Sequence, residues 1–300
     1  MALAGFFLTL LTVLFGAPFI RVFRQRAGAV IFWITGFVLS GIVVSIWQNM
    51  VNVDPQVAVE FLLVGMLVPA SWVVVGLFTE LEAKGMRWIW NGILSVVLGT
   101  TVYLAGAAKL LQLTGILNKQ QLADVFKVYF KKMPFLQPTA EFDFMTVVHQ
   151  IPSIAVMAIV MVLAHALIFE KAVYRWFRIP RERFAAQIKL LDFKLPDAFV
   201  WIGMVAFLGS ILDWNGQSHA INILNVCIVL FFLQGLAVLE YFYKTLRVGF
   251  FVRALGYFLF VFQLFVVLAL VGFIDFWVDF RKRIRKLPAK SQDNQNARLL

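Results

Sequence analysis

Hydrophobic residues fill eight long stretches of this chain, and shorter polar segments separate them. The stretches cover roughly residues 3–20, 28–48, 58–79, 89–111, 152–172, 197–212, 219–243 and 254–278. A bilayer core about 30 Å thick requires ~20 apolar residues of helix. The apolar residues are continuous and do not alternate with polar ones, which predicts helices and not the strands of a barrel. The pattern therefore predicts an all-α, polytopic transmembrane helix bundle with eight spans.

The polar segments and prolines predict how these spans are organised. We expect a single transmembrane domain over residues 1–280, with a polar insert at 113–150 and a basic, disordered tail over 281–300. Pro69 lies in the middle of the third stretch and predicts a kink, because proline removes a hydrogen bond of the helix ladder. Pro152 opens the fifth stretch and is expected in the first helical turn. The sixth stretch is so short that its crossing of the membrane stays open.

Two polar segments have the periodicity of amphipathic helices. In the insert, Asn118 and Gln121 form a capping box, and apolar residues follow at helical spacing until a proline: Leu122, Phe126, Tyr129 and Pro134. This helix either lies in the membrane interface or is part of a small cap packed on the spans. The loop over residues 171–194 repeats the spacing at Phe184, Ile188 and Leu191, which predicts a second interfacial helix.

Composition and charge narrow the class of protein. The chain is 62% hydrophobic and 14% charged, which excludes a water-soluble globule. Its net charge of +11 comes from Lys and Arg between the spans, where anionic lipid headgroups account for it better than nucleic acid does. We therefore expect the lipid bilayer as the main partner, a location in the bacterial cytoplasmic membrane, and no binding of nucleic acid. The basic loop over 171–194 favours a cytoplasmic position, but the basic tail leaves the overall orientation open.

The sequence carries no pattern typical of catalysis or cofactor binding. Cys227 is the single cysteine, and the three histidines lie far apart, so we expect neither a disulfide nor a metal site. Catalytic and phosphate-binding motifs are also missing from the sequence. We therefore expect no enzyme and no cofactor.

Small residues recur along two spans. They are Gly92, Ser95, Gly99 and Gly106 in the fourth stretch, and Gly36 and Ser40 in the second. Small residues on one helix face let a neighbouring backbone approach closely. We interpret both faces as packing surfaces within the bundle, and a contact with a second copy or a partner subunit is the alternative.

Three polar residues inside the spans are candidates for solute binding. Asn222 and Asn225 are three residues apart and share one helix face, and His165 lies deep in the fifth stretch. Polar side chains in lipid need partners and often mark a pathway for a substrate or an ion. The alternative for each is a hydrogen bond that joins two helices.

Charged and aromatic residues surround the end of the last span. Asp279 and Arg283 have the spacing of an ion pair on one helix. We interpret the whole segment as a membrane anchor at the headgroups, carried by Asp275, Trp277, Asp279, Arg281, Lys282 and Arg283. Binding of a partner protein is the alternative.

Several segments resemble one family of bacterial membrane proteins. They are residues 268–283, the Leu233–Ala237 run together with Asn225, and Leu195–Pro196 after the basic loop. These segments resemble the YybS-like family (domain of unknown function 2232), which is distantly similar to the substrate-binding subunits of energy-coupling-factor vitamin transporters. Such subunits dock a partner through an Ala-x-x-x-Ala motif in their first helix, which residues 3–20 lack.

Two classes of function follow. In the first, the bundle binds a small solute for transport, together with other membrane subunits, and Asn222, Asn225 and His165 line the site. In the second, the bundle is a non-transporting scaffold of the cell envelope, and its basic loop and tail are contact surfaces. The resemblance favours transport and does not identify the solute.

Overall fold

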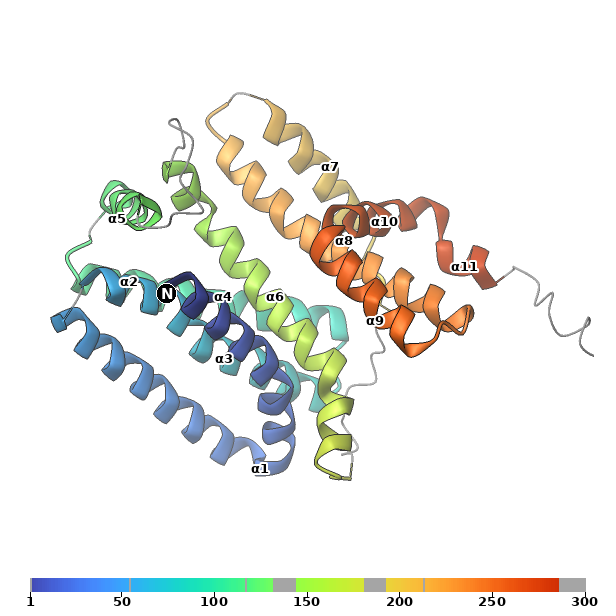
Figure 1. Ribbon diagram of the computed structural model, residues 1–300, viewed down its shortest axis with the longest axis horizontal. Coiled ribbons are helices and arrows are strands. Elements are labelled where there is room, and N and C mark those ends of the chain that lie inside the picture. The colour runs from blue at the N-terminus through green and yellow to red at the C-terminus, as the bar shows by residue number, and fades with distance from the viewer. Residues whose placement is uncertain are drawn as a thin grey trace, which may run out of the picture. The chain divides into compact units, whose positions relative to one another are not determined.

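The computed structural model describes residues 2–53, 55–116, 118–131, 144–180, 193–212 and 214–285. These residues form helices and contain no strand, which confirms the predicted all-α bundle (Figure 1). The helices are α1 (Ala2–Val53), α2 (Pro55–Gly65), α3 (Leu67–Ala83), α4 (Trp88–Leu113), α5 (Lys119–Lys131), α6 (Phe144–Trp176), α7 (Ala198–Ile211), α8 (Gln217–Thr245), α9 (Phe250–Phe258), a π-helical turn (Leu259–Gln263), α10 (Phe265–Val278) and α11 (Phe280–Arg285).

The chain divides into two compact units. Unit 1 contains Met1–Gln187 and Trp214–Asn222, and unit 2 contains Ile188–Asp213 and Ile223–Leu300. Unit 1 therefore holds α1 to α6 with the first residues of α8, and unit 2 holds α7, the rest of α8 and the helices after it. Among the described residues, five helical segments are long and apolar enough to cross a membrane, and α7 and α10 are shorter apolar helices.

The first two predicted spans form one helix, α1, with a sharp break. Gly28 has φ 79° and ψ 170°, and helical residues lie on both sides of it. Glycine adopts a positive φ without the steric cost that a Cβ brings. The apolar part of α1 has 40 residues, and as a straight helix it would measure about 60 Å, twice the thickness of a bilayer core. The break turns it into the two arms seen in Figure 1.

The predicted kink near Pro69 is present as the boundary between α2 and α3. α2 ends at Gly65 and α3 begins at Leu67, so the boundary lies at Met66, three residues before Pro69. Proline has no N–H for the carbonyl four residues earlier, which here is that of Gly65, and its ring crowds that carbonyl. The interruption is mild, because the backbone N–H of Met66 still donates to the carbonyl of Leu62 at 3.0 Å.

Pro152 lies inside α6 and not in its first turn, so this expectation was wrong. α6 begins at Phe144 and contains Pro152. The residues before the proline form a helical turn because Val148 packs in a cluster with Val59, Leu122 and Ala123. Tertiary burial thus extends the helix past a residue that commonly starts one.

α5 is the amphipathic helix expected in the insert. Both bonds of the capping box are present: the Gln121 N–H donates to Asn118 Oδ1 at 2.9 Å, and the Asn118 N–H to Gln121 Oε1 at 3.2 Å. Leu122 is buried and Phe126 packs beside it against residues of α2 and α6. The helix therefore packs on the spans. Tyr129 lies in α5, whereas Pro134, Phe184, Ile188 and Leu191 lie outside the described residues.

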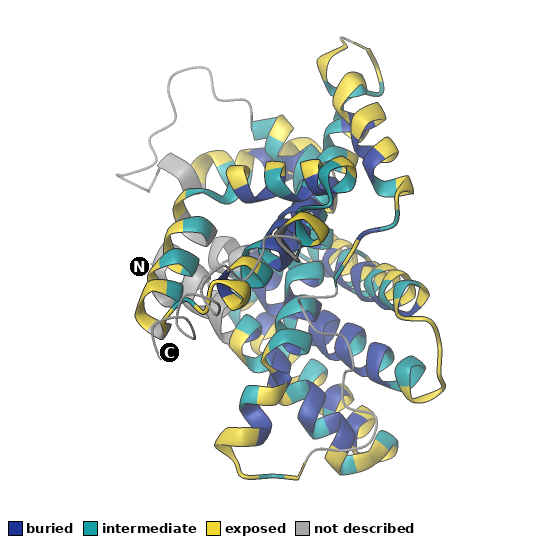
Figure 2. Ribbon diagram, turned by 90° about the vertical axis from the view of Figure 1, so that its right-hand side faces the viewer, coloured by how far each residue is buried: buried dark blue, intermediate teal, exposed yellow. Residues whose placement is uncertain are grey.

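α3 is the central helix of unit 1. Ten of its residues are buried, from Leu67 to Thr79, and it packs against α1, α4 and α6. Trp72 stacks on Phe32 of α1 with ring centroids 4.8 Å apart, and its indole N–H donates to the Phe32 carbonyl at 3.1 Å. Figure 2 shows buried and exposed residues on different sides of individual helices, as expected for a packed bundle.

In unit 2, the backbones of α8 and α10 approach each other closely at two glycines. A Cβ added at Gly235 of α8 would lie 1.9 Å from the Leu268 carbonyl oxygen, and one added at Gly272 of α10 would lie 1.9 Å from the Phe231 carbonyl oxygen. No heavier residue fits at either position without moving a backbone. Gly235 and Gly272 were not among the predicted packing residues.

The last predicted span is interrupted in its middle. α9 continues into a π-helical turn, and Leu264 then leaves the helical region with φ −115° and ψ 32°. Its N–H donates to the Leu259 carbonyl at 3.1 Å, which is the five-residue spacing of a π-helix. The prediction of one continuous helix over 254–278 was therefore wrong.

Candidate functional site

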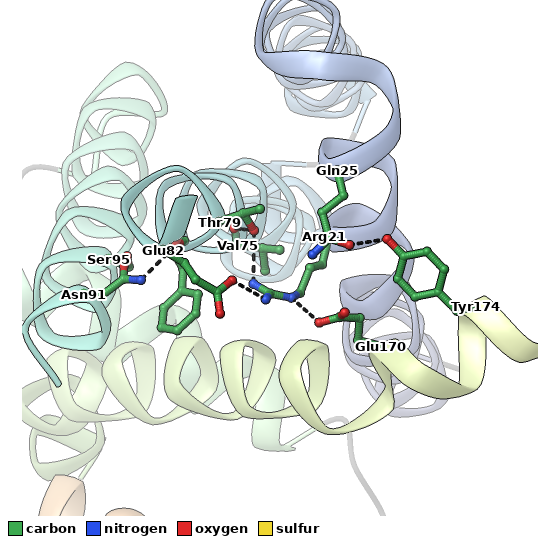
Figure 3. Close-up of polar contacts among 10 residues, drawn as sticks. Arg21, Gln25, Val75, Thr79, Glu82, Asn91, Ser95, Glu170 and Tyr174 are labelled. Carbon is green, nitrogen blue, oxygen red and sulfur yellow. Dashed lines mark hydrogen bonds and ion pairs between the residues drawn. The ribbon is translucent and has the colours of Figure 1, made fainter. Parts of the chain in front are cut away.

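A buried arginine joins three helices of unit 1. Arg21 lies in the first arm of α1, and its side chain is 0% exposed. Its Nε donates to Glu170 Oε2 of α6 at 2.6 Å, and one terminal nitrogen donates to Glu82 Oε2 of α3 at 2.5 Å. The other terminal nitrogen donates to Thr79 Oγ1 at 3.2 Å (Figure 3). We call Arg21, Thr79, Glu82 and Glu170 the Arg21 cluster.

Local structure fixes the partners of Arg21. Thr79 and Glu82 are three residues apart and therefore lie on one face of the α3 region. The Thr79 hydroxyl donates to the Val75 carbonyl at 2.8 Å, so its oxygen presents a lone pair to Arg21. The guanidinium also lies 5.5 Å from the centre of the Phe78 ring. Hydrogen bonds and the aromatic ring thus hold the arginine from three sides.

Two further polar contacts surround the cluster. Arg24 pairs with Glu80, with 2.7 Å between Nε and Oε1. The Tyr174 hydroxyl donates to the Gln25 carbonyl oxygen. Gln25 is 6% exposed, and its Nε2 has no hydrogen-bond partner among the described residues. A buried amide nitrogen without a partner carries a desolvation cost.

The same layer continues into α4 through two buried side chains. Asn91 Nδ2 donates to the Phe78 carbonyl at 2.9 Å, and Ser95 Oγ donates to Asn91 Oδ1 at 3.3 Å (Figure 3). Ser95, which we expected at a packing surface, is thus also part of a polar chain that begins beside the aromatic ring under Arg21.

The Arg21 cluster places two carboxylates on one guanidinium. All three groups lie in helical segments that are long and apolar enough to cross a membrane, Val13–Asn52, Phe61–Ala83 and Phe144–Trp176. Charged groups at such positions are costly and are concentrated at pathways for ions and substrates. A polar centre of this kind can exchange one ion-pair partner for another.

Sequence reasoning missed this site. The first predicted span ended at residue 20, directly before Arg21, whereas α1 remains helical from there to Gly28. A usable signal was present: with eight crossings, the ends of the first, third and fifth spans lie on one side of the membrane. Glu80, Glu82 and Glu170 stand at two of those ends, so complementary charges were already on the same side.

Asn222 forms the contacts of a helix-to-helix bond. Its Nδ2 donates to the His149 carbonyl at 2.8 Å and to the Ser218 carbonyl at 2.9 Å, and its Oδ1 accepts from the Ser153 N–H at 3.3 Å. Both donor hydrogens of the amide are therefore used by backbone carbonyls. Asn222 therefore forms a hydrogen bond that joins two helices, which was the alternative to solute binding.

The other two solute-binding candidates lie elsewhere. Asn225 is half-buried in unit 2. His165 is half-buried in α6, with ring centroids 5.7 Å from Phe15 and 4.3 Å from Phe169. At 1.5 Å per residue, His165 is roughly 20 Å along α6 from the backbone that Asn222 contacts. His165 and Asn222 therefore do not share one site in unit 1.

The glycine and serine candidates differ in their surroundings. A Cβ at Gly99 would lie 3.0 Å from Val74 Cβ, and Gly36 and Gly106 face the Trp72 ring and the Met66 side chain. A Cβ at Gly92 would meet no atom of the described residues within 4 Å. Ser40 Oγ donates within its own helix, to the Gly36 carbonyl at 2.7 Å.

The predicted membrane anchor includes a buried carboxylate. Asp275 is 1% exposed. It accepts from Gln234 Nε2 at 3.2 Å, from a terminal nitrogen of Arg281 at 2.9 Å and from the Phe280 N–H at 2.9 Å. Gln234 Oε1 in turn accepts from the Leu195 N–H at 3.0 Å. Asp275 therefore joins the end of α10 to α8 and to the segment before α7.

The expected ion pair of Asp279 with Arg283 is replaced by one with Lys282. Asp279 Oδ2 lies 2.8 Å from Lys282 Nζ, and Arg283 Nε donates to the Val278 carbonyl at 3.1 Å. Asp279 has φ 46° and ends α10, so Asp279 and Arg283 are not on one continuous helix. Trp277 is 52% exposed, as expected for a side chain at the membrane interface.

Comparison with known proteins identifies a family. No curated protein and no solved structure matches the chain. The family model described as "Predicted membrane protein (DUF2232)" matches residues 1–276. The chain therefore belongs to this family of membrane proteins, in agreement with its YybS-like resemblance.

Proposed function

We propose that this membrane protein is a small-solute-binding, transport-related subunit of the bacterial cytoplasmic membrane. The observation that carries the proposal is the Arg21 cluster: a fully buried arginine with carboxylates from two other helices, all within helices able to span a membrane. Buried ion pairs rarely add stability over apolar packing, so a role in binding accounts for their presence better than a purely structural one does.

Two further observations support this function. The final span is interrupted by a π-helical turn, and discontinuous helices are typical of transporters, where they form solute and ion sites. The YybS-like family is also expected to be distantly similar to substrate-binding subunits of vitamin transporters. Asn222 and His165 contribute less to the proposal, because their contacts are those of helix packing and aromatic packing.

The test is to identify what the protein retains after purification. The full chain is extracted in mild detergent, and small molecules released by denaturation are analysed by mass spectrometry. We expect a solute that co-purifies with the natural chain and is lost from Glu170→Gln. Lys171→Gln is the matched control, because Lys171 is the exposed neighbour of Glu170. If Glu170→Gln retains the solute, the Arg21 cluster is not part of the solute-binding site. Co-purification of proteins without any solute would favour the scaffold alternative.

A further inference from the structure

The two carboxylates on Arg21 differ in exposure. The Glu170 side chain is 0% exposed and the Glu82 side chain is 20% exposed. Glu82 also stands in the last turn of α3, directly before the exposed Lys84–Arg87 turn. Glu170 is therefore the inner partner of Arg21, whereas Glu82 covers the arginine from the side nearer to solvent.

A second hydrogen-bond donor lies beside the same arginine. Gln25 follows Arg21 by four residues, which places both side chains on one face of α1. Figure 3 shows the Gln25 side chain next to Arg21, with its carbonyl oxygen bonded to Tyr174. Its buried Nε2 has no acceptor among the described residues. An acceptor group of a molecule bound beside Arg21 would give this amide a partner.

From this geometry we propose that Glu82 occupies the place of a substrate carboxylate at Arg21. The proposal rests on the solute-binding function above and names its substrate class: small molecules that carry a carboxylate. One oxygen of the incoming carboxylate replaces Glu82 on the terminal nitrogen of Arg21, and a second acceptor group of the solute bonds Gln25 Nε2. Glu170 keeps its bond to Nε throughout.

The charge balance favours an exchange over a simple addition. An anion added to the intact cluster would bring a third carboxylate close to Glu82 and Glu170 in a poorly solvated region, which is costly. The replacement of one carboxylate by another leaves the buried charge unchanged. Arginine suits this exchange, because its planar, permanently charged fork matches the geometry of a carboxylate.

The experiment removes the internal carboxylate and supplies an external one. Glu82→Ala is purified as the full chain in nonionic detergent, and its melting temperature is measured in increasing acetate, with chloride at equal concentration as the reference. Glu80→Ala is the matched control, because the Glu80 side chain has a similar exposure of 22% and pairs with a different arginine, Arg24. We expect acetate to raise the melting temperature of Glu82→Ala saturably and several-fold more than chloride does. In Glu80→Ala and the natural chain Glu82 competes with acetate for Arg21, so the acetate-specific shift should be several-fold smaller.

The outcomes separate this inference from the proposed function. Equal effects of acetate and chloride on Glu82→Ala would overturn the inference, even if the natural chain retains a solute. An acetate-specific effect without any retained solute would support the carboxylate site and contradict the transport function. If Glu82→Ala does not fold, Glu82→Gln keeps the shape and removes the charge, and the same acetate-specific stabilisation is expected. If the only carboxylate that co-purifies with the natural chain belongs to a lipid, the site binds a lipid headgroup. This result would contradict the proposal that the substrate is a small soluble molecule.

Discussion

Arg21 and Glu170 are 149 residues apart in the sequence, and in the structure 2.6 Å separates Arg21 Nε from Glu170 Oε2. Neither side chain is exposed to solvent. This contact fixes the first arm of α1 against the second half of α6, and Glu82 extends it to α3. The three helices at the centre of unit 1 are thus joined by charge as well as by apolar packing.

Arg21→Leu should strongly destabilise the protein. The substitution removes the guanidinium that pairs with the buried Glu170 carboxylate, and loss of one partner of a buried pair costs about 3–5 kcal/mol. The measurement is chemical or thermal unfolding in detergent. Arg26→Leu is the control, since Arg26 is exposed and donates to the backbone carbonyl of Pro180. Equal losses in both variants would show that the buried position of Arg21 has no special importance.

Asn222→Leu should destabilise unit 1 by about 1–3 kcal/mol, because buried backbone groups of α6 lose their partner. The Asn222 amide bonds the His149 carbonyl and the Ser153 N–H, two groups that pair with each other in a regular α-helix. Pro152 lies between them and disturbs the helix. In a Pro152→Ala background the helix can become regular, so the same Asn222→Leu change should cost less. A double-mutant cycle measures the difference, and strict additivity would contradict this explanation.

The sequence predicted the helices better than their interruptions. Continuous apolarity predicted the spans, and Pro69 predicted the boundary between α2 and α3. The break of the last span at Leu264 was not predictable, because the surrounding run from Leu259 to Phe265 contains neither proline nor glycine. Gly28 was visible in the sequence, but its positive φ depends on how the two arms of α1 pack.

The candidate site was largely invisible in the sequence for a physical reason. Arginines at the end of an apolar stretch commonly face lipid headgroups, and the same pattern arises when they are buried. The partners of Arg21 are set by the packing of α1, α3 and α6, which local periodicity does not encode. Similarly, the helical spacing of Asn222 and Asn225 predicted a shared face, but the backbone that Asn222 contacts lies on another helix, near Pro152.

Gly235→Ala should lower the free energy of unfolding by about 1–3 kcal/mol, as overpacking does. The added methyl group would meet the Leu268 carbonyl oxygen at 1.9 Å, so α8 and α10 must move apart. Gly92→Ala is the matched control, because a Cβ there meets no described atom within 4 Å. Melting curves of both variants in detergent test this. An unchanged melting temperature for Gly235→Ala would show that the two helices are farther apart than described.

Asp275→Asn should loosen the end of α10 and the start of α11. The substitution keeps the shape of the side chain and removes the charge that pairs with Arg281 at 2.9 Å. Arg281 and the neighbouring Lys282 should then become more accessible to trypsin, which is measured as faster cleavage after these residues in detergent. Asp279→Asn is the control, since its partner Lys282 is already 75% exposed. If trypsin cleaves Asp275→Asn and the natural chain at equal rates, the buried ion pair does not stabilise the end of α10 and the start of α11.

The turn between α3 and α4 should face the cytoplasm. Lys84 and Arg87 are exposed in this turn, and Arg175 and Arg178 are exposed at the end of α6. The pairs of Arg24 with Glu80 and of Arg26 with the Pro180 carbonyl place the end of α3, the break of α1 and the end of α6 together. Positive residues concentrated at one end of membrane helices favour the cytoplasmic side.

A cysteine at Lys84 should therefore resist a membrane-impermeant thiol reagent in intact cells and react after permeabilisation. A cysteine at Lys119 should react in intact cells, because Lys119 is exposed at the start of α5, beyond the other end of α4. α4 has 26 residues and is about 39 Å long, enough to cross the bilayer core. The native Cys227 is buried and should contribute little background. The opposite labelling pattern would reverse the orientation, whereas labelling of both positions from outside would show that α4 does not cross the membrane.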